Sequence, residues 1–462
     1  MVKEIRLNAF HMNAPSHTWA GLWAHPNDAS MRHDTPEYWT HLARTAERGL
    51  LDAVFLADVI GVYDVYGASH DTAIRTGAQA PTLDPFPVVP LMAAVTENLG
   101  FGVTATLSYE RPYLLARRFS TLDHLTKGRM AWNIVTGILD SGAKGAGQGG
   151  LTDHDQRYAA AEEFLEVVYA LWEGSWADDA LTRDRQTRTY TRPDRVRRIS
   201  HHGAHYDLDA IHLVHPSPQR TPFLFQAGAS AAGRAFAGGH AEAVFINGHT
   251  RALVAETIRD IRRQAVAKGR RADDVKIFLG TTVIVAPTDA EAQDKHAEYQ
   301  RWVDDQGALA LLSGWSGIDL SRYDPDEPIQ HVEGNAMRSL IESITTRSPD
   351  RRWTVRDLVG FGQVGGRGAF VVGSPTTVAD ELQAWVQEAD VDGFNLTRVV
   401  VPESLEAVVD LLVPELQSRG AFKTQYAEGP LRQKIFGHPR LSSRHPAAQY
   451  RFTDAAEARA AE

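Results

Sequence analysis

Polar side chains lie at the ends of three short apolar runs in the sequence. Each run has the length and the near-continuous apolar character of a parallel strand that is buried on both faces. In a barrel, side chains at the carboxyl ends of such strands meet the ligand, so these hydroxyl, amide and carboxyl groups predict a polar ligand site. The residues concerned are Asp58 after the first run, Thr104 and Thr106 in the second, and Asn133 and Thr136 in the third.

Two further segments have the features of an anion-binding site. His154-Asp-Gln-Arg-Tyr158 begins a long helical pattern, and the N–H groups and dipole at a helix start favour a negative charge. Residues 226–231, with the sequence QAGASA, place small side chains and the Ser230 hydroxyl between a strand and a helix, as barrels do for phosphate. N-capping by Asp155 and Ser230 alone is the alternative interpretation. Together with the polar strand ends, the two segments predict a phosphorylated cofactor.

Three other patterns carry less weight. The G-x-G-x-x-G match at 145–150 does not follow a strand directly, so it indicates a loop and not a dinucleotide site. Imidazole pairs such as those among His201, His202 and His205 can bind zinc, but a catalytic site needs a further ligand on a defined frame. We expect no metal there and interpret the segment as a turn entering a strand. The arginine-rich stretch 183–198 could attract a phosphate or an acidic partner, although a solvated loop is the simpler interpretation.

Length and composition limit the class of protein. The chain has 462 residues, 43% of them hydrophobic, which supports a large core. It contains no cysteine, which excludes disulfides, thiolate metal sites and a cysteine nucleophile. Its net charge of −10 argues against binding to nucleic acid or to an anionic membrane surface. Without a signal-peptide pattern or a run of about 18 apolar residues, we expect a soluble, cytoplasmic protein.

The elements that must position these residues alternate along the chain. Eight apolar runs are each followed by a longer helical pattern, which is the order of a TIM (β/α)8 barrel. An open doubly wound sheet is the alternative fold. The predicted strands span residues 5–10, 53–57, 101–105, 130–135, 222–226, 243–247, 275–285 and 393–400, and the predicted helices span 36–48, 89–97, 114–125, 155–173, 252–268 and 405–418.

The length beyond a minimal barrel is predicted to lie in insertions. Barrel active sites lie at the carboxyl ends of the strands, so insertions are candidate walls and lids of the pocket. We expect a single barrel domain over residues 1–420, with insertions near 59–84, 174–217 and 306–370, and a C-terminal extension over 421–462.

Nine short motifs, spread over nearly the whole chain, are more specific than strand and helix patterns require. They are NAF at 8–10, FLAD at 55–58, LDHLTKGR at 122–129, AWNIVT at 131–136, HDQRY at 154–158, LWEGSW at 171–176, PSPQRTP at 216–222, QAG at 226–228 and DGFN at 392–395. These motifs resemble the bacterial-luciferase-like superfamily of reduced-flavin monooxygenases. Within it, they are most similar to the group of nitrilotriacetate, dibenzothiophene-sulfone and long-chain-alkane monooxygenases.

The resemblance implies a TIM barrel that binds reduced FMN (FMNH2), delivered by diffusion from a separate NAD(P)H-dependent flavin reductase. It further implies that O2 forms a flavin hydroperoxide, which inserts one oxygen atom into the substrate. A homodimer or homotetramer is the assembly that it favours. At the matching positions, the flavin ring is expected near Phe10, Ala57, Asp58, Thr104, Asn133, Val135 and Thr136. The phosphate is expected at His154, Tyr158, Gly228, Ser230 and Ala231.

Three residues match catalytic-pocket positions of the alkane enzymes in this group. His17 could exchange a proton with the oxygenating group near neutral pH, or it could be a hydrogen-bonded loop histidine. Tyr63 and Gln79 lie in the first insertion, where each could act on the substrate or only stabilise the loop.

The pocket departs from those alkane enzymes at Ala14, Ile138 and Leu311, where the resemblance places a cysteine and two histidines. The more apolar pocket favours a small organosulfur substrate such as dimethylsulfide, cleaved at its C–S bond to a thiol and an aldehyde. A long-chain alkane or another heteroatom compound is the alternative substrate. From other classes, the alternatives are a non-catalytic flavin- or deazaflavin-binding protein and a metal hydrolase that uses the histidines at 201–205.

Overall fold

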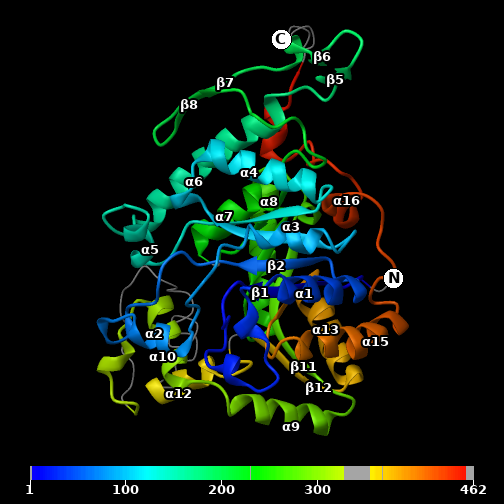
Figure 1. Cartoon of the computed structure of the whole chain (residues 1–462). Helices are drawn as coiled ribbons and strands as arrows, with labels where there is room; N and C mark the ends of the chain where they lie inside the picture. The colour runs from blue at the N-terminus through cyan, green and yellow to red at the C-terminus, as the bar shows by residue number, and fades with distance from the viewer. Residues whose placement is uncertain (1–2, 229, 327–353, 367, 454–462) are drawn as a thin grey trace.

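The computed structural model describes residues 3–228, 230–326, 354–366 and 368–453, and its centre is a closed barrel of parallel strands (Figure 1). The barrel strands are β1 (Arg6–Met12), β2 (Ala53–Ala57), β3 (Gly100–Thr106), β4 (Met130–Val135), β9 (Phe223–Gln226), β10 (Ala243–Ile246), β11 (Lys276–Val285) and β13 (Gly393–Thr397). Neighbouring strands pair in chain order, and the pairing of β1 with β13 closes the circuit. The predicted TIM barrel is therefore confirmed, and the open doubly wound sheet was wrong.

The barrel strands are buried on both faces, which explains their continuous apolar sequence. Aromatic rings fill the interior: the ring centroid of Phe10 lies 5.5 Å from that of Phe55 and 4.8 Å from that of Phe245, edge to face. Helices cover the outside of the barrel. They are α1 (Pro36–Arg48), α3 (Val88–Ala93), α4 (Pro112–Leu125), α6 (His154–Tyr169), α7 (Ala231–His240), α8 (Arg251–Ala267), α9 (Asp289–Gln300), α13 (Pro375–Ala389), α14 (Glu403–Ala407) and α15 (Val413–Ser418). The short helix α5 (Asp140–Gly145) packs against the first insertion, where Ser141 Oγ donates to the Val62 carbonyl at 2.7 Å.

The C-terminal segment closes the amino end of the barrel. α16 (Leu431–Phe436) adds Leu431 and Ile435 to the interior aromatic cluster. Arg432 of the same helix is fully buried, and its Nε lies 2.6 Å from Glu242 Oε1. Loss of either partner would leave an uncompensated buried charge, so this ion pair fixes α16 against the barrel.

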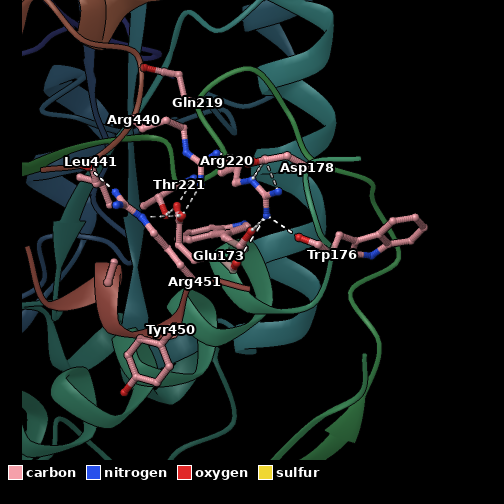
Figure 2. Close-up of polar contacts among 12 residues, drawn as sticks. Glu173, Trp176, Asp178, Gln219, Arg220, Thr221, Arg440, Leu441, Tyr450 and Arg451 are labelled. Atoms are coloured by element: carbon pink, nitrogen blue, oxygen red, sulfur yellow. Dashed lines mark hydrogen bonds and ion pairs between the residues drawn. The ribbon is translucent and has the colours of Figure 1, made fainter. Parts of the chain in front are cut away.

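A second buried polar group holds the chain that follows α16 (Figure 2). Glu173 lies in the π-helical stretch η5 (Ala170–Gly174), which continues α6, and its side chain is 1% exposed. Its Oε1 accepts a hydrogen bond from Thr221 Oγ1 at 2.7 Å, and its Oε2 accepts one from Arg440 Nη2 at 2.8 Å. Arg451 lies 3.9 Å from the same carboxylate. Two distant parts of the chain are therefore joined through one carboxylate.

The first and third insertions pack together at the carboxyl ends of the strands (Figure 1). Their helices are α2 (Asp71–Thr76), α10 (Asp305–Ser316) and α12 (Val355–Gly362), whose side chains form one apolar cluster. Residues 327–353 and 367 of the third insertion, Trp353 among them, fall outside the described part of the chain. Within that described part, no helix is both long enough and apolar enough to cross a membrane.

The second insertion lies away from these helices, at the opposite end of the molecule (Figure 1). It forms two hairpins, β5 (Leu181–Asp184) with β6 (Thr189–Thr191), and β7 (Ile199–His202) with β8 (Asp207–Ala210). Because this segment follows a helix and precedes a strand, it leaves the barrel at the amino ends of the strands. None of its residues lines the cavity at the carboxyl ends, so the expectation that it forms a wall of that pocket was wrong.

One strand of the barrel sheet was not predicted from the sequence. β12 (Ala369–Gly373) pairs in parallel with the outer half of β11, in a register that runs from Thr281 opposite Ala369 to Val285 opposite Gly373. β12 is therefore an addition to the barrel sheet and not one of the strands that close it.

Candidate active site

A cavity of about 410 Å³ lies where β2 and β3 end, between the strand ends and the first insertion. The strands contribute Asp58, Thr104 and Thr106 to its wall, and the first insertion contributes Gln79 and Asp84. The structure thus brings predicted cofactor residues and a predicted catalytic residue to one cavity. Of these residues, Asp84 was not predicted from the sequence.

The ends of β3 and β4 are joined through their side chains. The register places Thr104 opposite Asn133 and Thr106 opposite Val135. Asn133 Nδ2 donates to Thr104 Oγ1 at 2.8 Å, and Thr104 Oγ1 donates to the Leu56 carbonyl at 2.8 Å. These two hydrogen bonds leave Asn133 Oδ1 as a buried acceptor with no hydrogen-bond partner in the described structure. An unsatisfied buried acceptor is costly, so this oxygen indicates a ligand with a donor group.

Asp58 follows β2 directly and is partly buried beside the cavity. Burial, with the negative charge of Asp84 as the second cause, raises the pKa of the Asp58 carboxyl to about 7, although a hydrogen bond from the Val59 N–H opposes the rise. A carboxyl group with this pKa can accept or donate a proton near neutral pH.

The other strand-end positions lie around the same edge of the barrel. Phe10 lies in β1, and its register partner is Phe55. Ala57 ends β2 opposite Met12, and Thr136 follows β4 with its carbonyl accepting a hydrogen bond from Ser108 Oγ at 2.8 Å. These positions supply apolar surface and backbone groups beside the polar side chains.

The two predicted anion segments meet, although more than seventy positions separate them. Ser230 caps α7, and its Oγ accepts a hydrogen bond from the Gly233 N–H at 3.0 Å. The same oxygen lies 3.3 Å from Nε2 of His154, the first residue of α6. Burial raises the pKa of the Tyr158 phenol, while its hydrogen bond to Ser230 lowers it. The capping interpretation of Ser230 is therefore confirmed, and the shared contact with α6 makes the two segments one polar cluster.

Gly228 keeps this cluster open. A Cβ at Gly228 would lie 2.3 Å from Gln226 Nε2 and 3.1 Å from the Gly233 Cα, so a larger residue would fill the space. Gln226 Oε1 is buried and has no hydrogen-bond partner in the described residues. Ala231 begins α7 and places its backbone at the same helix start, where a negative charge is favoured.

The three predicted catalytic residues lie in one hydrogen-bonded group. The Tyr63 hydroxyl donates to Gln79 Oε1 at 2.9 Å, and Gln79 Nε2 donates to the His17 carbonyl at 2.6 Å. The His17 ring packs edge to face against Phe10, with 4.3 Å between centroids. Trp315 of α10 completes the group, and its indole Nε1 donates to the Tyr63 hydroxyl at 2.9 Å. Trp315 was not predicted from the sequence, because only the fold brings α10 to Tyr63.

An apolar cluster packs against this hydrogen-bonded group. Leu311 is 1% exposed and shares the cluster with Tyr63, Leu139 and the partly buried Ile138. Ala14 is fully buried, and its carbonyl accepts a hydrogen bond from an arginine guanidinium. None of the three residues at which the sequence departs from the alkane enzymes supplies a titratable group, and two of them, Ile138 and Leu311, meet in this cluster.

The histidines at 201–205 lie in the hairpin of the second insertion, far from this cavity. His201 Nε2 lies 3.1 Å from Glu163 Oε1, and the same carboxylate accepts the backbone N–H of His205. Across the residues that the structure describes, no cluster of three or more His, Asp or Glu could hold a metal ion. These contacts anchor the hairpin to α6.

Comparison with known proteins identifies the same class as the sequence motifs. Residues 9–393 match the family model described as luciferase-like monooxygenase. The chain is 48% identical to the dimethyl-sulfide monooxygenase of Hyphomicrobium sulfonivorans, over 98% of this chain and 94% of the relative. It is 44% identical to the long-chain alkane monooxygenase of Geobacillus thermodenitrificans (strain NG80-2), over 98% and 99%. The crystal structure of a riboflavin lyase with modified FMN superposes with a TM-score of 0.92 at 36% identity, over 98% and 100%.

Proposed function

The chain belongs to the luciferase-like monooxygenase family, and we propose that it oxygenates a small organosulfur compound, such as dimethylsulfide, with reduced FMN and O2. The apolar cluster that contains Leu311 and Ile138 and packs against Tyr63 is the observation that carries the substrate assignment. A neutral sulfide has no charge to pair, so it loses little beside such a cluster, whereas a carboxylated chelate would need buried cations.

The described residues fit a flavin phosphate. Asn133 Oδ1 and Gln226 Oε1 are buried acceptors without partners, and flavins carry N–H and hydroxyl donors that could satisfy them. The cluster of His154, Tyr158 and Ser230 offers donors beside the start of α7 for the phosphate, and Gly228 leaves the necessary space. Bound reduced FMN would react with O2 and supply the oxygen atom that is transferred to the substrate.

The protein's own residues have three tasks in this proposal. The apolar cluster around Leu311 excludes water from the reacting groups and holds the substrate against the cavity. Asp58 can hold or release a proton at its carboxyl oxygen near neutral pH. The His17 ring, packed against Phe10, is proposed to donate or accept a hydrogen bond to the reacting group at a ring nitrogen.

In the proposed reaction, one oxygen atom of O2 enters a C–H bond next to sulfur, and the other leaves as water with the two electrons and two protons of the reduced flavin. The resulting hydroxymethyl sulfide breaks at its C–S bond into methanethiol and formaldehyde. We propose that a separate NAD(P)H-dependent flavin reductase supplies FMNH2 and that the chain works as a homodimer or homotetramer.

A reconstituted assay tests the substrate. The purified protein, a flavin reductase, FMN, NADH and dimethylsulfide are mixed in air, and methanethiol and formaldehyde are measured in the vapour and the solution. Equal amounts of both products are expected. The absence of thiol, with no loss of sulfide, would overturn the substrate assignment. Because a 44% identical relative is an alkane monooxygenase, an alkane series in the same assay tests the second candidate.

A further inference from the structure

A directional chain of hydrogen bonds connects the third insertion to the loop that carries His17. It runs from Trp315 Nε1 to the Tyr63 hydroxyl at 2.9 Å, from that hydroxyl to Gln79 Oε1 at 2.9 Å, and from Gln79 Nε2 to the His17 carbonyl at 2.6 Å. All four residues are buried, with at most 7% of any of them exposed.

The groups at the two ends of this hydrogen-bond chain fix the direction in which each hydrogen is donated. An indole N–H can only donate, so the Tyr63 oxygen must accept from Trp315 and must direct its single proton elsewhere. A backbone carbonyl can only accept, so the His17 end requires the NH2 side of the Gln79 amide. The remaining Oε1 then receives the Tyr63 proton. The amide orientation of Gln79, which is normally ambiguous, is thus fixed from both sides.

A count of hydrogens shows what is left for a ligand. The side chains of Trp315, Tyr63 and Gln79 carry one, one and two polar hydrogens, and the chain uses three of these four. Among the described residues, the second Nε2 hydrogen of Gln79 has no acceptor, and Gln79 lines the cavity. The Tyr63 proton is already committed to Gln79.

The backbone geometry maintains this arrangement. A Cβ at Gly314 would lie 2.0 Å from Tyr63 Cδ1, so the absence of a side chain lets α10 approach the phenol ring. Gln79 has a φ of 54°, in the left-handed region that non-glycine residues adopt at a cost. Strained residues persist where several contacts hold them, and here both ends of the Gln79 amide are bound.

We propose that Trp315 is a positioning residue, which sets the direction of the chain so that Gln79 presents an amide N–H donor to the cavity. Trp315 acts through Tyr63 and need not touch the substrate. Leu311 lies one turn earlier on the same helix, so these hydrogen bonds also hold the apolar cluster around Leu311 at the loop that carries His17. The identity of the ligand that Gln79 contacts rests on the proposed function, but the order of the hydrogen bonds from Trp315 to His17 does not.

The hydrogen-bond chain can be tested in the protein without flavin or substrate. Trp315→Phe removes the indole N–H and keeps an aromatic ring, and Trp176→Phe is the matched control. Trp176 lies in the second insertion, and its Nε1 donates to the His212 carbonyl at 2.7 Å, far from the Trp315 hydrogen bonds. Backbone amide exchange over residues 14–20 is measured by mass spectrometry without flavin or substrate. We expect Trp315→Phe to accelerate exchange there about two- to tenfold, the range of one net hydrogen bond, and Trp176→Phe to leave it unchanged.

The order of the hydrogen bonds allows a second test, which compares single and double variants. Tyr63→Phe breaks the chain one step later, so Trp315→Phe should add nothing to the exchange rate of Tyr63→Phe. Full additivity of the two changes, or no effect of Trp315→Phe, would overturn the proposal. In the reconstituted assay, both single variants should raise KM for the sulfide more than they lower kcat. Because the exchange measurement needs no turnover, it stands even if the substrate assignment fails.

Discussion

Ser230 has two roles in the proposed site, and one substitution can separate them. Its Oγ caps α7 by accepting the Gly233 N–H at 3.0 Å, and the same oxygen faces His154 Nε2 at 3.3 Å in the proposed phosphate site. Ser230→Ala removes both roles. Ser230→Asp keeps the cap, because Asp and Ser cap helices about equally well, but places a carboxylate where the phosphate should bind.

The expected magnitudes differ between the two variants. Loss of the cap in Ser230→Ala costs about 1 kcal/mol of stability, which in a chain of this length lowers the unfolding midpoint by about 1 °C. Loss of one net hydrogen bond to the phosphate weakens FMN binding about fivefold. In Ser230→Asp, two like charges about 4 Å apart repel by about 4 kcal/mol at an effective dielectric constant of about 20. His154 can offset part of that repulsion, so we expect a loss of affinity of about a hundredfold or more.

Calorimetric titration with FMN and thermal unfolding without it provide the two measurements. Thr250→Ala is the matched control, because Thr250 caps α8 through the Leu253 N–H at 3.4 Å and is not part of the polar cluster around Ser230. It should lower the unfolding midpoint like Ser230→Ala and leave FMN affinity unchanged. If Ser230→Asp bound FMN as tightly as Ser230→Ala, or if affinity simply followed stability across the variants, Ser230 would be a cap and nothing more.

Three further predictions follow from buried groups. Because the folded-state pKa of Asp58 is raised to about 7, its contribution to stability is present below about pH 4 and is lost as the pH rises through 7; Asp58→Asn should remove this loss, and parallel unfolding midpoints of both proteins from pH 5 to 8.5 would contradict it. Leu311→Ala should cost about 2–5 kcal/mol in urea unfolding and admit longer dialkyl sulfides in the reconstituted assay; an unchanged substrate range would argue against Leu311 as a pocket wall. Glu173→Gln should cost about 2 kcal/mol, less than for a fully buried pair because the Arg440 side chain is 30% exposed, with FMN affinity unchanged; stability equal to that of the parent protein would show that the carboxylate does not hold the C-terminal chain.

The barrel strands could be predicted because burial on both faces leaves continuous apolar runs in the sequence. All eight predicted runs overlap a barrel strand, and helices α1, α4 and α8 lie within two residues of their predicted bounds. β12 was missed because its partner is the outer half of β11, a tertiary pairing that no local pattern encodes. The segment around His205 was correctly interpreted as a turn entering a strand, here β8, whereas β5, β6 and β7 were missed because their strands are largely exposed and lack an apolar face.

The residues at the strand ends of the site could also be predicted from the sequence, because they are polar residues that end apolar runs. Asp58 and Thr104 were predicted in this way, and the structure places both at the cavity. The site residues in the insertions could not be predicted from sequence patterns. Trp315 and Tyr63 are 252 positions apart, and neither residue type carries a signal of its own in a loop or a helix. Tyr63 and Gln79 entered only through family resemblance.

The strand side and the insertion side of the site differ in how well they tolerate substitution. On the strand side, Thr104 and Asn133 bind each other and the barrel backbone, so a substitution there would disturb the barrel as well as the ligand. On the insertion side, Ile138 and Leu311 contribute only apolar surface. Volume-conserving apolar exchanges at such positions usually cost less than about 1.5 kcal/mol. Substrate range should therefore vary through α10 and the loop after β4, while the Trp315 chain keeps the amide of Gln79 oriented for whichever substrate the wall admits.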